Sequence, residues 1–197
     1  GAGERLIEQA RTVLAERDRL RTMANEAKDR ITGTLHVGML PTLSPYLLPL
    51  LLPALEAAHP DLTLVLREWP TAEVLDALRR DQLDVALIAT DEAGPDLYDD
   101  VLFTEPFVGY VAADHPLADR DRLTAADLSA DDLWLLSEGH CFRDQVLQVC
   151  GHAPAAPRHT AQFESGSLET LVRLVRNSGG RTLLPVLATH HMPPGEH

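Results

Sequence analysis

Small and apolar residues recur at alternating spacings of four and three along the first part of the chain, with Arg17 as the interruption. This is the a/d spacing of a helix that presents a narrow seam to a partner helix. It predicts a linker and dimerisation helix over residues 1–31. The alternative is an amphipathic helix that lies on its own domain. The seam consists of Leu6, Ala10, Val13, Leu20, Ala24, Ala27 and Ile31.

After residue 31 the pattern changes from helical to strictly alternating. Three strand patterns enclose two helical patterns, in the order 31–39, 47–59, 62–66, 71–80 and 83–89. The order β-α-β-α-β with apolar strands predicts a parallel sheet with helical crossovers. Ligands of such sheets bind at the carboxyl ends of the strands, which here means the turn at 40–44.

A second α/β unit follows. Its predicted elements are strand 107–112, helix 125–128, strand 133–136, helix 142–150, strand 162–163, helix 167–176 and strand 182–184. Ser165 or Ser167 is available to cap the late helix, and Gly179-Gly180 ends it. The predicted domains are therefore the helix 1–31, a first lobe 32–104, a second lobe 105–188 and a crossover or tail 189–197.

Composition and charge narrow the function. Hydrophobic residues make up 45% of the 197 residues and the net charge is −13, which indicates an ordinary globular protein. A domain that grips DNA normally carries a basic face, so this chain alone is a poor candidate. The longest apolar stretch, 46–55, is too short for a membrane span and contains Pro49 and Pro53. With no apolar leader segment, the expected location is the cytoplasm.

The two cysteines carry the candidate chemistry. Cys141 is predicted at or just before a helix N-terminus, where the helix dipole and the nearby Arg143 favour the reactive thiolate. Cys150 lies nine residues later. In a continuous helix the two thiols would be roughly 13 Å apart along the axis and on opposite sides, whereas a disulfide needs Cα atoms within about 7 Å. Oxidation and the helix therefore exclude each other, which is the property of a switch. The alternative is that both are small buried hydrophobes.

The segment Gly139-His140-Cys141-x-Arg143-Asp144-Gln145, followed by Cys150, resembles the redox segment of the peroxide-sensing LysR-type transcriptional regulators. The stretches 40–49, 167–171 and 182–185 are similar to the wider family. The resemblance implies a two-lobed, periplasmic-binding-protein-like regulatory domain preceded by a dimerising linker helix. DNA is then expected to bind only through a winged helix-turn-helix domain that normally precedes this helix and is absent from these residues.

The resemblance also implies roles for single residues. Cys141 matches the peroxidatic cysteine and Cys150 the resolving one. The implied peroxide pocket consists of Thr42, Thr71, His140, Arg143 and Asp144. Four of the five pocket residues have a simpler interpretation: Thr42 as a turn residue, Thr71 as a helix N-cap, Asp144 as a favourable first-turn acid and His140 as a packing residue.

Further implied partners are hydrogen peroxide, a second copy in a homodimer or homotetramer, and a thiol reductant such as glutaredoxin or thioredoxin. No cofactor is implied. The chain departs from the family pattern in a Pro- and Ala-rich loop after Cys150, in Gln162 where a helper histidine is sometimes found, and in stopping before the return that completes the first lobe.

Three rival functions were weighed. A metal site is disfavoured because the nine histidines, including His190, His191 and His197, lack zinc-ligand spacing. A thiol peroxidase shares the first chemical step, but an enzyme has no evident need of a dimerising helix. A regulator that binds an organic anion would use Thr42, Ser165 and Ser167. We therefore expect a non-enzymatic sensor that controls oxidative-stress genes through a reversible Cys141–Cys150 disulfide.

Overall fold

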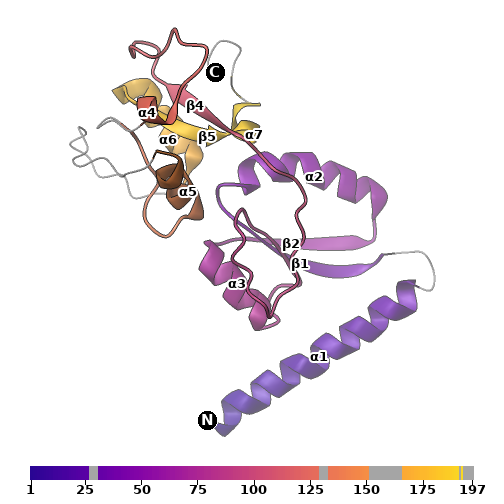
Figure 1. Cartoon of the computed structure of the whole chain (residues 1–197). Helices are drawn as coiled ribbons and strands as arrows, with labels where there is room; N and C mark the ends of the chain where they lie inside the picture. Colours follow the sequence, from indigo (N-terminus) through magenta and orange to yellow (C-terminus); the bar gives the residue numbers. More distant parts are fainter. Residues whose placement is uncertain (27–30, 129–132, 151–165, 191, 193–197) are drawn as a thin grey trace. The chain divides into compact units, whose positions relative to one another are not determined.

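The computed structural model describes residues 1–26, 31–128, 133–150, 166–190 and 192, with part of the side chains of the first helix. The chain divides into two compact units, Gly1–Leu97 and Tyr98–His197. Each unit contains both helices and strands, which confirms the α/β class (Figure 1). The predicted lobe boundary at 104/105 stays a prediction.

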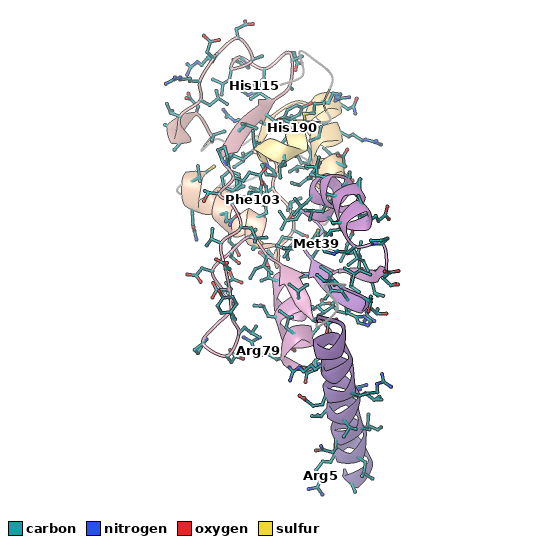
Figure 2. The ribbon with its side chains drawn as sticks, turned by 90° about the vertical axis from the view of Figure 1, so that its right-hand side faces the viewer. Arg5, Met39, Arg79, Phe103, His115 and His190 are labelled. Atoms are coloured by element: carbon teal, nitrogen blue, oxygen red, sulfur yellow. The ribbon has the colours of Figure 1, made fainter. Side chains whose placement is uncertain are left out.

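The first helix, α1 (Ala2–Glu26), is a single run of 25 residues. At 1.5 Å per residue it is about 37 Å long. Leu6 and Val13 of the predicted seam are 71% and 60% exposed. Figure 2 shows described side chains, Arg5 among them, projecting from this helix. The helix is confirmed over these residues, 27–30 lie outside the described chain, and its role in dimerisation stays a prediction.

The remainder of the first unit is built on a parallel sheet with strand order β2-β1-β3. Parallel neighbours need crossover connections, and the two helices supply them, as the alternating pattern predicted. In chain order the elements are β1 (Gly33–Met39), α2 (Ser44–Ala58), β2 (Leu62–Glu68), α3 (Thr71–Arg79) and β3 (Val85–Leu87).

The third strand is shorter than the alternation predicted. Leu83 is buried in a cluster with Val74 and Ala77 instead of extending the ladder. The Asp84 carboxylate accepts the His36 N–H at 2.7 Å, and the Asp84 N–H donates to the His36 carbonyl. Just before β3, one backbone bond to β1 is therefore kept, while a side-chain carboxylate accepts the His36 N–H.

The second unit contains a two-stranded antiparallel sheet, β4 (Phe107–Val111) with β5 (Arg181–Pro185). The predicted strand at 133–136 is wrong: Leu133 forms only an isolated bridge to Arg181. The ladder stops there because the Thr182 hydroxyl, not a backbone N–H, donates to the Trp134 carbonyl at 2.9 Å.

Four helices accompany this sheet in the described residues: α4 (Ala125–Leu128), α5 (Cys141–Cys150), α6 (Leu168–Ser178) and α7 (Val186–Thr189). Ser167 caps α6, since its side chain accepts the Thr170 N–H, and Gly179 ends the helix at φ 79°. The predicted strand at 162–163, Ser165 and Gln162 lie outside the described residues. No helix in the described part of the chain is both long and apolar enough to cross a membrane.

Candidate redox site

The two cysteines lie at opposite ends of one helix. Cys141 is the first residue of α5 and Cys150 the last, and the helix between them is continuous. The two cysteines are not joined in a disulfide, and the two residues are only 9% and 5% exposed. The predicted placement of Cys141 at a helix start is confirmed.

This placement keeps the thiols from bonding while the helix persists. Nine residues of α-helix rise about 13 Å and turn through about two and a half turns, so the side chains leave opposite sides of the axis. A disulfide between them requires Cα atoms within about 7 Å. At least part of α5 must therefore unwind before such a bond can form.

The entrance of α5 is tightly built. Gly139 turns the chain at φ 87°, and the His140 carbonyl accepts the Arg143 N–H at 2.9 Å. The Arg143 guanidinium donates to the Leu136 carbonyl at 2.9 Å. A Cβ atom on Gly166 would lie 2.2 Å from His140 Cε1, so only glycine lets that segment approach the imidazole. His140 and Arg143, two predicted neighbours of the thiol, are therefore held by local contacts. Arg143 bonds to the Leu136 carbonyl, and the His140 ring lies against Gly166.

One face of α5 is anchored in the core of its unit. Phe142 and Val146 are 5% and 1% exposed. The Phe142 ring meets Phe107 of β4 edge to face, with 5.4 Å between ring centroids. Asp144, on the first turn, is exposed. Unwinding α5 must therefore remove buried side chains from the core. This costs free energy, which opposes formation of a Cys141–Cys150 disulfide.

The Cys150 thiol has a distinct electrostatic environment. Burial raises the pKa of Cys150, and the charge of Arg181 opposes this rise. The last turn of α5 has no basic residue of its own. Near neutral pH Cys150 is therefore a protonated thiol, and a protonated thiol is a poor nucleophile.

This raised pKa predicts a pH dependence of stability. An unfolded thiol loses its proton near pH 8.5, roughly, whereas folded Cys150 keeps it. The stability it contributes is complete below the unfolded pKa and is lost as the pH rises through the folded one. Under reducing conditions, the free energy of unfolding should therefore fall more between neutral pH and about pH 9.5 in the wild type than in Cys150→Ser.

Urea unfolding at the two pH values measures this difference. Cys141→Ser is the matched control, because it keeps Cys150 and should keep the full decrease. An equal decrease in Cys150→Ser and in wild type would contradict the prediction.

Buried hydroxyl groups gather at the carboxyl edge of the first unit's sheet. Thr42, Ser44 and Thr71 are 4%, 1% and 5% exposed. The Ser44 hydroxyl donates to the Glu68 carboxylate at 2.5 Å. Pro70 holds the N-cap position of α3, so the N-cap interpretation of Thr71 is wrong. Its Oγ1 is buried with no hydrogen-bond partner in the described part of the structure.

The five predicted pocket residues are divided between the two units. Thr42 and Thr71 belong to the first unit, whereas His140, Arg143 and Asp144 belong to the second with Cys141. Within each unit they lie near one another in the chain or along one sheet edge. Their assembly into one pocket stays a prediction.

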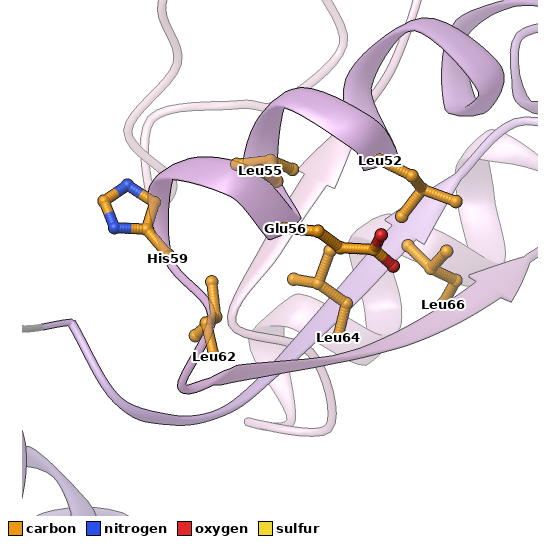
Figure 3. Close-up of a pocket in the computed structure, with 7 residues that line it drawn as sticks. All are labelled: Leu52, Leu55, Glu56, His59, Leu62, Leu64 and Leu66. Atoms are coloured by element: carbon orange, nitrogen blue, oxygen red, sulfur yellow. The ribbon is translucent and has the colours of Figure 1, made fainter.

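A separate groove, lined by leucines together with Glu56 and His59, lies between α2 and β2 in the first unit (Figure 3). Leu62, Leu64 and Leu66 form its strand side, and Leu52 and Leu55 its helix side. It contains neither cysteine. Among the described residues no group of three or more His, Cys, Asp or Glu side chains is placed to hold a metal ion.

Sequence reasoning missed two residues of the redox site. Gly166 shapes the contact with His140, and Arg181 carries the charge that reaches Cys150. Gly166 gave no usable signal, because a single loop glycine is common. Arg181 did give one: it is a lone charge at the start of an apolar strand.

Comparison with known proteins shows the family of this chain. Residues 28–196 match the LysR substrate binding domain. The chain belongs to the LysR substrate-binding domain family. It is 41% identical over 187 residues to the hydrogen peroxide-inducible genes activator of Dickeya chrysanthemi. The matched region covers 95% of this chain and 61% of that relative. The DNA-binding transcriptional dual regulator OxyR of Escherichia coli K12 is 39% identical over 193 residues, covering 98% of this chain and 62% of the relative.

Solved structures place this LysR-type domain close to OxyR. A hydrogen-peroxide-bound cysteine-to-serine mutant of OxyR from Corynebacterium glutamicum superposes with a TM-score of 0.80 at 34% identity, covering 99% of this chain and 62% of that one. The reduced OxyR regulatory domain from Pseudomonas aeruginosa gives 0.73 at 37% identity, covering 84% of this chain and 79% of that one.

The predicted likeness to peroxide-sensing LysR-type regulators is confirmed, as is membership in a family of transcription regulators rather than enzymes. The chain spans about three fifths of the length of these curated relatives, 61% and 62%. The disulfide, the pocket residues and the partners stay predictions.

Proposed function

We propose that this chain is the regulatory part of an OxyR-like transcription regulator that senses hydrogen peroxide through a reversible Cys141–Cys150 disulfide. One observation carries the proposal: two buried cysteines, not joined in a disulfide, lie at opposite ends of a single helix that cannot persist once they bond. The family supports it, because its relatives include peroxide-inducible gene activators and a peroxide-bound structure.

The chemistry takes two steps. The Cys141 thiolate attacks one peroxide oxygen; an S–O bond forms, the O–O bond breaks, and the leaving hydroxide takes a proton to become water. Cys150 then attacks the Cys141 sulfur; the S–S bond forms, the S–O bond breaks, and the second hydroxide leaves as water with the Cys150 proton. Two thiols are oxidised and one peroxide is reduced. A dithiol reductant such as thioredoxin, or a glutaredoxin, returns the disulfide to thiols.

The protonation states suit this division of labour. Cys141 lies in the first turn of α5, where the helix dipole favours an anion, while burial raises the pKa of Cys150. Cys141 is therefore the residue that reacts with peroxide, and Cys150 stays a protonated thiol until the second step. An isolated pair of structural hydrophobes would have no reason to differ in this way.

The pocket residues receive roles from the same scheme. Arginine carries five N–H donors, so the bond from Arg143 to the Leu136 carbonyl leaves donors for the thiolate or the peroxide. The buried Thr71 hydroxyl, which has no partner among the described residues, can hold a peroxide oxygen, and Thr42 lies at the same sheet edge. His140 and Asp144 flank the reacting thiol and its arginine.

Formation of the disulfide would change how the full regulator is placed on DNA. In the proposed two-lobed, periplasmic-binding-protein-like domain, unwinding of α5 changes the surface of the second lobe. The exposed apolar row of α1, with Leu6 and Val13, supplies the pairing surface of a linker helix in a dimer or tetramer. A rearranged assembly then repositions DNA-binding domains attached to it and changes the transcription of oxidative-stress genes.

Peptide mapping by mass spectrometry tests the core of the proposal. The reduced chain is digested and mapped before and after treatment with a single equivalent of hydrogen peroxide. We expect a linked Cys141–Cys150 peptide that dithiothreitol or thioredoxin reverses. Two unmodified thiols after the same treatment would reject the peroxide-sensing function.

The buried hydroxyls of the first unit favour a second candidate, a LysR-type domain that binds a small organic anion. Thr42 and Thr71 offer hydroxyl donors at the strand ends where such sheets bind ligands, whereas the Ser44 hydroxyl already donates to the Glu68 carboxylate. Ser167 is a weaker candidate than the sequence indicated, because its oxygen already accepts the Thr170 N–H. Titration calorimetry with a panel of small carboxylic acids separates the candidates, since a peroxide sensor should bind none of them tightly.

A further inference from the structure

A buried arginine lies in the core of the second unit, at the start of β5. Arg181 is 6% exposed, and an arginine side chain remains charged in any protein environment. Its backbone is fixed on two sides: it pairs with Val111 in the antiparallel ladder, and its carbonyl accepts the Trp134 N–H at 2.8 Å. The backbone that carries this cation is therefore held in the sheet.

The guanidinium reaches towards the redox helix through α4. One of its nitrogens donates to the carbonyl of Asp127, which belongs to α4, and α4 packs against α5. The Asp127 carboxylate itself is directed elsewhere, accepting from Arg120 at 2.8 Å and from the Thr124 hydroxyl at 2.7 Å. Arg181 of β5 thus bonds to a neutral carbonyl of α4, which in turn packs against α5, and we call this series of contacts the junction.

Cys150 belongs to α5, the last element of this junction. It is the buried last residue of α5, at the helix end where the dipole disfavours an anion, and no basic residue lies in the last turn. The charge of Arg181 lowers the pKa of Cys150 against the effect of burial. The last turn of α5 has no cation of its own, and Arg181 of β5 supplies the charge that acts on this thiol.

We propose that Arg181 is a positioning residue for closure of the disulfide, a buried cation that stabilises Cys150 as it becomes the attacking thiolate. The inference rests on the proposed function and refines it, because it assigns to Arg181 the rate of the second step only. The first step, attack of Cys141 on peroxide, takes place at the other end of α5. Loss of the charge should slow resolution and leave oxidation of Cys141 unchanged.

Quenched-flow oxidation of the full chain tests this assignment. Samples are trapped with a sulfenic-acid reagent and an alkylating agent, and mass spectrometry follows Cys141 sulfenic acid and the linked peptide over time. Arg181→Gln removes the charge but keeps an N–H donor for the Asp127 carbonyl. Without the charge, a smaller fraction of Cys150 is thiolate, but each remaining thiolate is more basic and therefore more nucleophilic. A tenfold smaller thiolate fraction thus slows disulfide formation by about threefold. We expect the linked peptide to form about three- to tenfold more slowly and the sulfenic acid to form at the wild-type rate.

Two variants separate charge from structure. Arg181→Lys keeps a cation and should restore resolution to within about twofold of wild type. Trp134→Phe loosens the same junction, by removing the indole bond to the Gly179 carbonyl, but leaves Arg181 in place, and it should resolve normally. If Arg181→Gln does not fold, as judged by its urea unfolding curve, Arg181→Met serves as the charge-free variant.

Resolution at the wild-type rate in the charge-free variant would overturn the inference. So would equal slowing in Arg181→Gln, Arg181→Lys and Trp134→Phe, because that result indicates a purely structural role. A wild-type chain that forms neither sulfenic acid nor linked peptide would instead reject the proposed function.

Discussion

Replacing Cys141 by serine should abolish formation of the Cys141–Cys150 disulfide by hydrogen peroxide. A serine hydroxyl does not form the anion needed to attack peroxide at neutral pH, and no neighbouring thiol can replace it. Cys150 is buried at the far end of α5 with a raised pKa, so it is a protonated and inaccessible nucleophile. The expected result in peptide mapping is complete loss of the linked peptide, with Cys150 recovered as a free thiol.

Cys150→Ser is the matched variant for this prediction. Cys141 should still be oxidised, but its sulfenic acid has no partner and persists, or proceeds to sulfinic acid when peroxide is in excess. The two variants therefore fail at different steps, one before oxidation and one after it. Equal responses to peroxide from wild type and both variants would contradict the assignment of roles.

Local sequence signals were sufficient for the elements that carry the thiols. The start of α5 at Cys141 could be predicted because Gly139 breaks the chain and Phe142 and Val146 follow at helical spacing. The parallel sheet could be predicted because β1 changes the period from helical to alternating and apolar strands then recur between helices. These signals depend on residues close together in the chain, so no tertiary knowledge was needed.

The errors have two causes: hydrogen bonds or charges between distant residues, and, at Thr71, the proline that precedes it. The strand predicted at 133–136 reduces to a bridge because the Thr182 hydroxyl takes the Trp134 carbonyl. Thr71 has a typical N-cap residue type, yet Pro70 takes that position. Arg181 is 31 residues from Cys150 in the chain, 181 against 150, and its influence could not be inferred without the packing of α4 on α5.

The packing of α5 also predicts how a core substitution shifts the equilibrium between the dithiol and disulfide forms. Val146 is 1% exposed at the centre of the helix that must unwind for the disulfide to form. Val146→Ala should lower the free energy of unfolding of the reduced chain by about 2 kcal/mol, because it removes buried methyl groups. In the disulfide form this packing is already lost, so the substitution costs less there. The equilibrium should therefore shift towards the disulfide by up to about thirtyfold, which makes the reduction potential about 40 mV more negative.

Val149→Ala is the control for that shift, since it removes the same methyl groups from the same helix at a position that is 42% exposed. Alanine is the better helix former, and this gain favours the reduced form equally in both variants. Val149→Ala should thus leave the potential unchanged or raise it slightly, and the difference between the two variants isolates burial. Equilibration in thiol–disulfide buffers, followed by alkylation and peptide mapping, measures both potentials. If Val146→Ala destabilised the reduced chain without moving its potential, Val146 would remain packed in the disulfide form, and the unwinding of α5 would have to be confined to one side of that residue.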